Sequence, residues 1–135
     1  MQDEFKKVLR ENPNGVLASR DGDKIRTRIF QYLFLEENKV YFCTSSDKKV
    51  YQQISAHPYV NFCIFARDFA PVLSLGGPAV FVEDRALKAR ALDENPAIKG
   101  IYKSADNPAF KIFYLKVEEI DTFSYARGSK NYKIA

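Results

Sequence analysis

Apolar residues along the chain recur with two periods, which separates the expected helices from the expected strands. Phe5, Val8 and Leu9 follow helical spacing, so residues 3–11 are expected to form a short amphipathic helix. Elsewhere alternating or short apolar runs dominate, and Gly, Pro, Asn and Asp interrupt them. The pattern predicts strands at residues 16–19, 24–35, 40–44, 59–66, 72–83 and 110–123. It also predicts helices at residues 47–56, 84–95 (with Asp84 as the N-cap) and 97–102, and a basic, partly loose tail over residues 124–135.

Short turns join most of the expected strands. Asp21-Gly22-Asp23 is typical of a tight hairpin, because Asp-Gly supplies the positive φ that such turns need, and Glu36-Glu37-Asn38 closes a second hairpin. Short connections favour antiparallel pairing. The chain is therefore predicted to be mainly β (α+β), a small antiparallel barrel with flanking helices in a single domain, residues 1–135.

Two features of the expected strands carry further information. Gly76-Gly77-Pro78 interrupts the strand at residues 72–83, which indicates a bulge or a place where a ligand or another backbone comes close. On the strand at residues 24–35, Arg26 and Arg28 share a face with Phe30. These arginines can form an exposed edge, with their stems lying over aromatic side chains.

The helix expected to begin at Asp47 has an unusual charge pattern. Lys48 and Lys49 fall in its first turn, where the partial positive charge of the helix dipole disfavours cations. A bound anion reverses that penalty, and the hydroxyl-rich turn Thr44-Ser45-Ser46 precedes the helix. These groups together predict a phosphate site. The alternative is a solvated helix start that is capped by Asp47 or Ser46.

Composition narrows the class of protein. The 135 residues are 46% hydrophobic and include eleven Phe and eight Tyr, which favours a strand-rich, aromatic core. No apolar run approaches the roughly 18–20 residues that span a bilayer, and the N-terminus lacks a signal-peptide hydrophobic segment, so we expect no membrane partner and a cytoplasmic location. Cys43 and Cys63 are expected to be buried, reduced thiols. The net charge of +4 suits an anionic ligand. The lysines are spread out and no aromatic RNP-like signature is present, which disfavours nucleic acid.

Familiar catalytic motifs are absent from the sequence. No G-x-G-x-x-G follows a strand and there is no P-loop. Two cysteines and one histidine cannot assemble a usual zinc site. His57 stands at a helix end before Pro58, which favours a structural role over a place in a catalytic triad. We therefore nominate no catalytic side chain, and expect that any difficult chemistry would be carried by a cofactor.

Three stretches taken together resemble the pyridoxamine 5′-phosphate oxidase-like family of FMN-binding split β-barrels. They are Arg28-Ile29-Phe30-Gln31, the stretch Val40-Tyr41-Phe42-Cys43-Thr44-Ser45 with Lys48, Lys49, Gln53 and His57-Pro58-Tyr59-Val60 after it, and Leu75-Gly76-Gly77-Pro78-Ala79-Val80. The likeness covers residues 16–123 and is strongest to the small bacterial nitroimidazole-resistance and general-stress-protein-like members. It implies a six- to seven-stranded antiparallel split β-barrel with flanking helices.

The resemblance also implies a homodimer with FMN at the subunit interface. Arg28 would reach the phosphate or the ribityl chain, and Ile29, Phe30 and Gln31 would run beside the isoalloxazine ring. Thr44 and Ser45 would donate hydrogen bonds to the phosphate, Lys48 and Lys49 would neutralise it, and Gln53 is a further cofactor-binding candidate.

The activity that the resemblance implies is that of an NAD(P)H-linked oxidoreductase acting on a small-molecule acceptor. The alternatives are a flavin-binding stress or sensing protein without turnover, and a haem- or deazaflavin-binding split barrel. Pyridoxamine phosphate oxidation itself is disfavoured, because the chain has no Trp and its last arginine, Arg127, has a context unlike that of the oxidases. His57 does not match the histidine that many nitroimidazole-resistance relatives place near the flavin.

Overall fold

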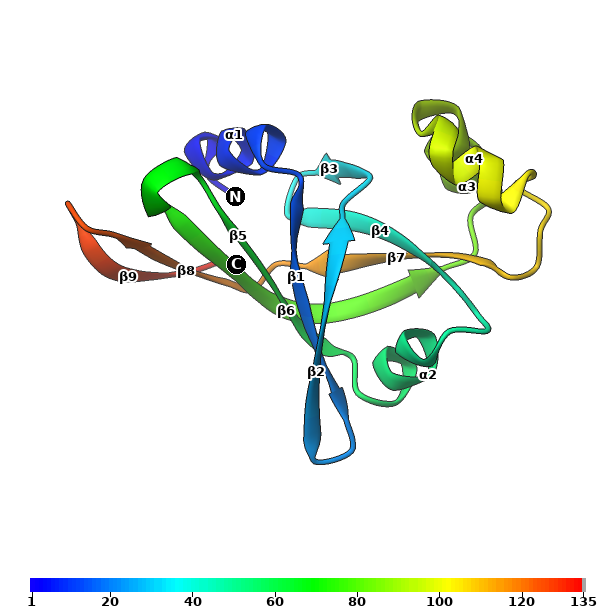
Figure 1. Cartoon of the computed structure of the whole chain (residues 1–135), viewed down its shortest axis with the longest axis horizontal. Helices are drawn as coiled ribbons and strands as arrows, with labels where there is room; N and C mark the ends of the chain where they lie inside the picture. Colours follow the sequence, from blue (N-terminus) through cyan, green and yellow to red (C-terminus); the bar gives the residue numbers. More distant parts are fainter. Residues whose placement is uncertain (135) are drawn as a thin grey trace.

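The computed structural model describes residues 1–134, and its strands form a mainly antiparallel arrangement with helices at its margins (Figure 1). In chain order the elements are α1 (Asp3–Glu11), β1 (Asn14–Asp21), β2 (Lys24–Gln31), β3 (Phe34–Glu36), β4 (Lys39–Ser45), α2 (Lys49–Ala56), β5 (Tyr59–Phe65), the 3-10 helix η1 (Arg67–Phe69), β6 (Val72–Val82), α3 (Arg85–Glu94), α4 (Pro96–Tyr102), β7 (Phe110–Lys116), β8 (Glu119–Ser124) and β9 (Gly128–Lys133).

Strand β6 connects the two halves of the sheet. Within residues 1–134 nine strands are present, seven of them in the order β2-β1-β5-β6-β7-β4-β3, with β8 beside β6 and β9 beside β8. The first part of β6 pairs with β5 and β8, whereas residues 79–82 pair with β7. One strand therefore belongs to both sheets, and the predicted fold class, an antiparallel split β-barrel with flanking helices, is confirmed. The strand β2 lies at one end of the order and has a free edge.

Two of the predicted long strands are wrong in their extent, because each changes partner midway. Residues 24–35 divide into β2 and β3: the N–H of Tyr32 donates to the Pro13 carbonyl, whereas that of Leu33 donates to the Tyr41 carbonyl. Residues 110–123 divide into β7 and β8, since the N–H of Val117 donates to Asn38 and that of Glu118 to Gly76. The apolar run continues through the first break, so the hydrophobic pattern gave no sign of it. At the second break the buried positions change phase from Val117 to Ile120 across Glu118-Glu119, a sign that the prediction of one long strand overlooked.

The glycine pair in β6 does not interrupt the strand, so the predicted break is wrong. β6 runs without a gap from Val72 to Val82. A Cβ atom at Gly77 would lie 1.9 Å from the carbonyl oxygen of Lys116, and one at Gly76 would lie 3.0 Å from the Tyr59 hydroxyl. Close approach of another backbone, the second possibility raised by the sequence, therefore explains Gly77.

The tail that was expected to be partly loose is a strand over residues 128–133, which form β9 against β8, while Ala135 lies outside the described residues. Gly128, with φ of 68°, permits the tight turn between the two strands. Polar cross-strand pairs follow the ladder: Asn131 donates to Asp121 over 2.6 Å, and Lys133 pairs with Glu119. The segment lacks an apolar alternation, so its strand character came from pairing rather than from its own pattern.

Aromatic side chains fill the larger core. The rings of Phe42 and Phe62 are 4.9 Å apart and those of Phe42 and Phe113 are 5.2 Å apart, and all three side chains are fully buried. Burial of each ring contributes about 2–3 kcal/mol to the free energy of unfolding. A second cluster lies under α3 and α4 and includes Phe34 and Phe110.

The helices follow the sequence prediction closely. α1 has the predicted bounds, and Asp84 caps α3 by accepting hydrogen bonds from the N–H groups of Ala86 and Leu87. Figure 1 shows α2 and the α3–α4 pair on the side of the molecule opposite the β8–β9 ribbon. Cys43 and Cys63 are free thiols, although both are only partly buried. No helix among residues 1–134 is long and apolar enough to cross a membrane.

Candidate functional site

A cleft of about 540 Å³ opens between the free edge strand β2, the end of β4, the start of α2 and helix α4. Seven of the nine predicted cofactor-binding residues line it: Arg28, Ile29, Phe30, Gln31, Thr44, Lys48 and Lys49. Cys43, Val50 and Ile98 complete the lining. The structure therefore brings together two stretches that the sequence separates by a hairpin.

Helix α2 begins two residues later than predicted, and this changes the roles at its start. The helix runs from Lys49, and Lys48 occupies the N-cap position in an extended conformation without a side-chain cap. Asp47 instead accepts a short hydrogen bond from the Ser45 hydroxyl. Capping by Asp47 or Ser46, the alternative left open by the sequence, is therefore not what the structure shows.

The uncapped helix start leaves hydrogen-bond donors available. Among residues 1–134, no backbone or side-chain acceptor is present for the N–H groups of Lys49 and Val50. Neither Lys48 nor Lys49 has an acidic partner within 4.0 Å in the same part of the chain. The cleft thus receives free donors, the positive end of a helix dipole and two ammonium groups, which is the composition of an anion site.

Arg28 adds a third cation, and neutral groups hold it in place. Its Nη2 donates to Oε1 of Gln53 over 3.0 Å, and its Nη1 donates to the Ser19 hydroxyl over 3.4 Å. Arg26 behaves differently, because it is engaged by the Asp21 carboxylate at 3.1 Å outside the cleft. The two arginines are thereby distinguished: Arg26 belongs to an exposed edge, whereas the Arg28 charge has no acidic partner in the described chain.

The remaining cleft residues differ in exposure. Ile29 is 73% exposed and Gln31 is exposed, whereas Phe30 is half-buried, with its ring 5.8 Å from that of Phe42. Thr44 is buried. The cleft therefore offers an apolar surface and strand-edge backbone groups beside its cations.

Two predicted residues do not line the cleft. Ser45 is buried and directs its hydroxyl to Asp47, and Gln53 contacts Arg28 from the side of α2. Gln53 therefore acts on a residue that lines the cleft, and Ser45 acts on Asp47 beside it. Cys43 was missed although it adjoins Thr44, and Ile98 was missed because only the tertiary fold brings α4 to the cleft.

Burial controls the chemistry of Cys43. Burial raises the pKa of its thiol to about 11, although the Lys48 ammonium acts in the opposite direction. The thiol therefore stays protonated at neutral pH and is a poor nucleophile. Within residues 1–134 no group of three or more His, Cys, Asp or Glu residues is placed to hold a metal. His57 lies at the far end of α2 and does not line the cleft.

The fold and the cleft together define a split-barrel protein with a cation-lined cleft at a helix start. The family model described as "Pyridoxamine 5'-phosphate oxidase" matches residues 1–124, and the chain therefore belongs to this family. A search of curated proteins gives no significant match.

Solved structures share the fold. A NimC/NimA family protein from Clostridium acetobutylicum is 25% identical, with a TM-score of 0.84 over 97% of this chain and 90% of that chain. A heme binding protein from Mycobacterium smegmatis is 20% identical, with a TM-score of 0.79 over 97% of this chain and 57% of that one. A pyridoxamine 5'-phosphate oxidase-related, FMN binding protein from Nostoc punctiforme is 13% identical, with a TM-score of 0.66 over 99% and 96% of the two chains.

Proposed function

We propose that the chain binds FMN in the cleft at the start of α2 and works as an FMN-dependent oxidoreductase on a small molecule. The observation that carries the proposal is the convergence of Arg28, Lys48 and Lys49 on one cleft beside an uncapped helix start. A phosphate dianion offsets three cations that have no acidic partner in the described chain. Family membership and an FMN binding neighbour support the choice of FMN over other phosphates.

The residues present fit both ends of this cofactor. At the phosphate end, the N–H groups of Lys49 and Val50 and the Thr44 hydroxyl can donate, and the cations supply charge. At the ring end, Ile29 and Gln31 belong to a free sheet edge, where alternate backbone N–H and C=O groups have no strand partner. A flat heteroaromatic ring with a polar edge matches such backbone groups.

The chain's own residues would bind and orient, while FMN supplies the capacity to accept and release a hydride when it is bound. Arg28, held by Gln53, would fix the phosphate end, and Phe30 would provide an apolar wall. Cys43 would contribute a neutral thiol, since its pKa of about 11 keeps it protonated. NAD(P)H is the electron donor that we propose, and the acceptor is a small molecule.

A homodimer is part of the proposal. The outer face of β1, β2 and β5 carries exposed apolar side chains: Val16, Ile25, Ile29 and Phe65. Val16 pairs across the ladder with Ile29 and with Cys63, so these side chains share one face. Ile29 also lines the cleft, and a second subunit seated on this face would border the cofactor.

Haem is the second candidate, favoured by the likeness to the heme binding protein. Its support is weaker in the cleft itself, because the single histidine of the chain, His57, does not line it. An absorption spectrum of purified protein distinguishes the two cofactors, since oxidised flavin and haem have different visible absorption bands. A deazaflavin would be identified in the same spectrum.

Two measurements test the proposal. The first is the spectrum of protein purified after addition of FMN, with fluorescence titration to obtain the Kd; protein that neither retains nor binds FMN would refute it. The second is NAD(P)H oxidation by the FMN-loaded protein with a panel of quinone, nitroaromatic and flavin acceptors. Tight FMN binding without turnover on any acceptor would favour the stress or sensing protein over the enzyme.

A further inference from the structure

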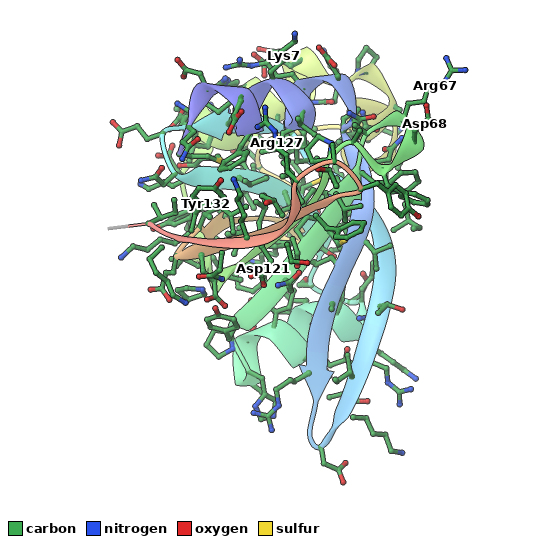
Figure 2. All side chains as sticks on the ribbon, turned by 90° about the vertical axis from the view of Figure 1, so that its left-hand side faces the viewer. Lys7, Arg67, Asp68, Asp121, Arg127 and Tyr132 are labelled. Atoms are coloured by element: carbon green, nitrogen blue, oxygen red, sulfur yellow. The ribbon has the colours of Figure 1, made fainter. Side chains whose placement is uncertain are left out.

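A second cavity lies between helix α1 and the β8–β9 ribbon, on the side of the molecule away from α2 (Figures 1 and 2). Its volume is about 430 Å³, which is within the range of small-molecule sites. It shares no lining residue with the cleft at α2, so a ligand here would be independent of the proposed cofactor.

The floor of this cavity is aromatic. Phe5 from α1 is 4% exposed, and its ring meets that of Tyr132 from β9 edge-on at 5.2 Å. Val8 and Pro71 extend the apolar lining. Phe123 pairs with Val72 and so lies on the other face of the sheet from Tyr132, and it contributes with Tyr125 only to the exposed margin of the cavity. An edge-on pair of rings beside apolar side chains favours a flat, aromatic ligand body over an aliphatic chain.

Charged groups of both signs stand around this floor and come from different elements. The acids are Glu4 on α1 and Asp68 on η1, and the bases are Arg127 in the β8–β9 turn and Lys130 on β9. Figure 2 shows Arg127 between α1 and the ribbon, and Asp68 beside Arg67 at η1.

These four charged side chains are unpaired. Among residues 1–134 none of them lies within 4.0 Å of an opposite charge, whereas Lys133 and Glu119 on the same ribbon do pair. The acids and the bases line one cavity without forming ion pairs with one another, so both signs of charge remain available to a ligand.

We propose that this cavity binds a small aromatic zwitterion, of the chemical class of the aromatic α-amino acids. The carboxylate lies at Arg127 and Lys130, the ammonium lies at Glu4 and Asp68, and the ring rests on the aromatic floor. Because the four lining charges cancel, a phosphate-bearing polyanion meets as much repulsion as attraction. The arrangement therefore selects a ligand that carries one charge of each sign.

Calorimetric titration of the full-length, FMN-saturated protein tests this directly with three probes. L-phenylalanine carries both charges, 3-phenylpropionate lacks the ammonium, and phenethylamine lacks the carboxylate. We expect saturable binding of L-phenylalanine, at least about fivefold tighter than that of either comparator, since one charge-assisted contact contributes roughly this factor. Equal affinities for the three probes, or no saturable heat, would overturn the proposal.

Matched variants assign the effect to this cavity. Arg127→Gln should weaken L-phenylalanine about fivefold and leave phenethylamine unchanged, while Glu4→Gln should leave 3-phenylpropionate unchanged. Arg67→Gln changes an exposed base of η1 outside the lining and should alter nothing. Val8→Trp or Thr122→Trp should abolish binding by filling the cavity, with circular dichroism used to confirm folding. Undiminished binding in Arg127→Gln, or in a folded filling variant, would contradict the assignment.

Discussion

The guanidinium of Arg28 on the edge strand β2 donates a 3.0 Å hydrogen bond from Nη2 to Oε1 of Gln53 on α2. The bond joins two elements that line the cleft, and it fixes the direction of a charge that has no acidic partner within residues 1–134. A neutral amide suits this role, because a carboxylate here would consume the charge that an anion needs.

Gln53→Leu should therefore weaken FMN binding about tenfold without unfolding the protein, since it removes one hydrogen bond to a charged group. Gln53→Glu should weaken it more, because the new carboxylate competes with the phosphate for Arg28. Fluorescence titration with FMN measures both effects. Gln52→Leu, the same change at the neighbouring exposed residue outside this cleft, is the control and should bind as the wild type does. Unaltered affinity in Gln53→Glu would move the phosphate away from Arg28.

Lys48→Glu combined with Lys49→Glu should abolish FMN retention while the apo protein still folds. Each reversal replaces attraction by repulsion beside the phosphate, and together they should raise the Kd roughly a hundredfold or more. The chain supplies a matched control in Lys6→Glu with Lys7→Glu, which makes the same charge change in α1, away from the cleft. If both double variants lose flavin equally, net charge rather than the site governs binding.

The part of the site that the sequence predicted is local, and the part that it missed is not. Lys48 and Lys49 stood out because a helix start disfavours cations, and this physical conflict can be recognised within a few residues. Arg28 and Gln31 entered through a family resemblance. Ile98 could not be found in either way, because it reaches the cleft only through the packing of α4 in the folded chain.

The features of the fold that the sequence predicted are also local ones. Alternation and turn residues predicted which segments are extended, and the residue type of Asp84 predicted the cap of α3. The changes of partner at Leu33 and Glu118 depend on distant carbonyl groups, at Tyr41 and Gly76, which are fixed by the tertiary fold. Strand β9 likewise depends on pairing with β8.

Gly77→Ala should destabilise the protein by about 3 kcal/mol, because the added methyl group would lie 1.9 Å from the carbonyl oxygen of Lys116 and one strand must move. A Cβ at Gly100 meets nothing within 4 Å, so Gly100→Ala in α4 should be neutral or stabilising by about 0.5 kcal/mol. Urea unfolding of both variants gives the comparison. A Gly77→Ala protein as stable as the wild type would mean that β6 and β7 can separate at this point without cost.

Cys43 should react with iodoacetamide only slowly near neutral pH. With a pKa of about 11, raised mainly by burial, roughly one thiol in a thousand is ionised at pH 8, and only the thiolate reacts. In a Cys63→Ser background, the labelling rate should rise about tenfold for each pH unit between 8 and 10, and bound FMN should slow it further. Mass spectrometry of timed samples gives the rate. A plateau near pH 9 would show that the thiol ionises as an exposed cysteine does.

The exposed apolar face of β1, β2 and β5 leads to the last prediction. Ile25 is 74% exposed on this face and does not line the cleft, so it reports on association without touching the cofactor residues. Wild-type protein should sediment with twice the 15.5 kDa mass of one chain, and Ile25→Asp should shift it to the monomer, because a buried, unpaired carboxylate is costly at an interface. Ile101→Asp places the same charge at a comparably exposed isoleucine on α4 and should leave the dimer intact.

FMN affinity measured on the Ile25→Asp monomer then separates two roles of the second subunit. A large loss would mean that the partner supplies part of the cofactor site, whereas full affinity would mean that the cleft of one chain suffices. A wild-type protein that sediments as a monomer would remove the dimer from the proposal.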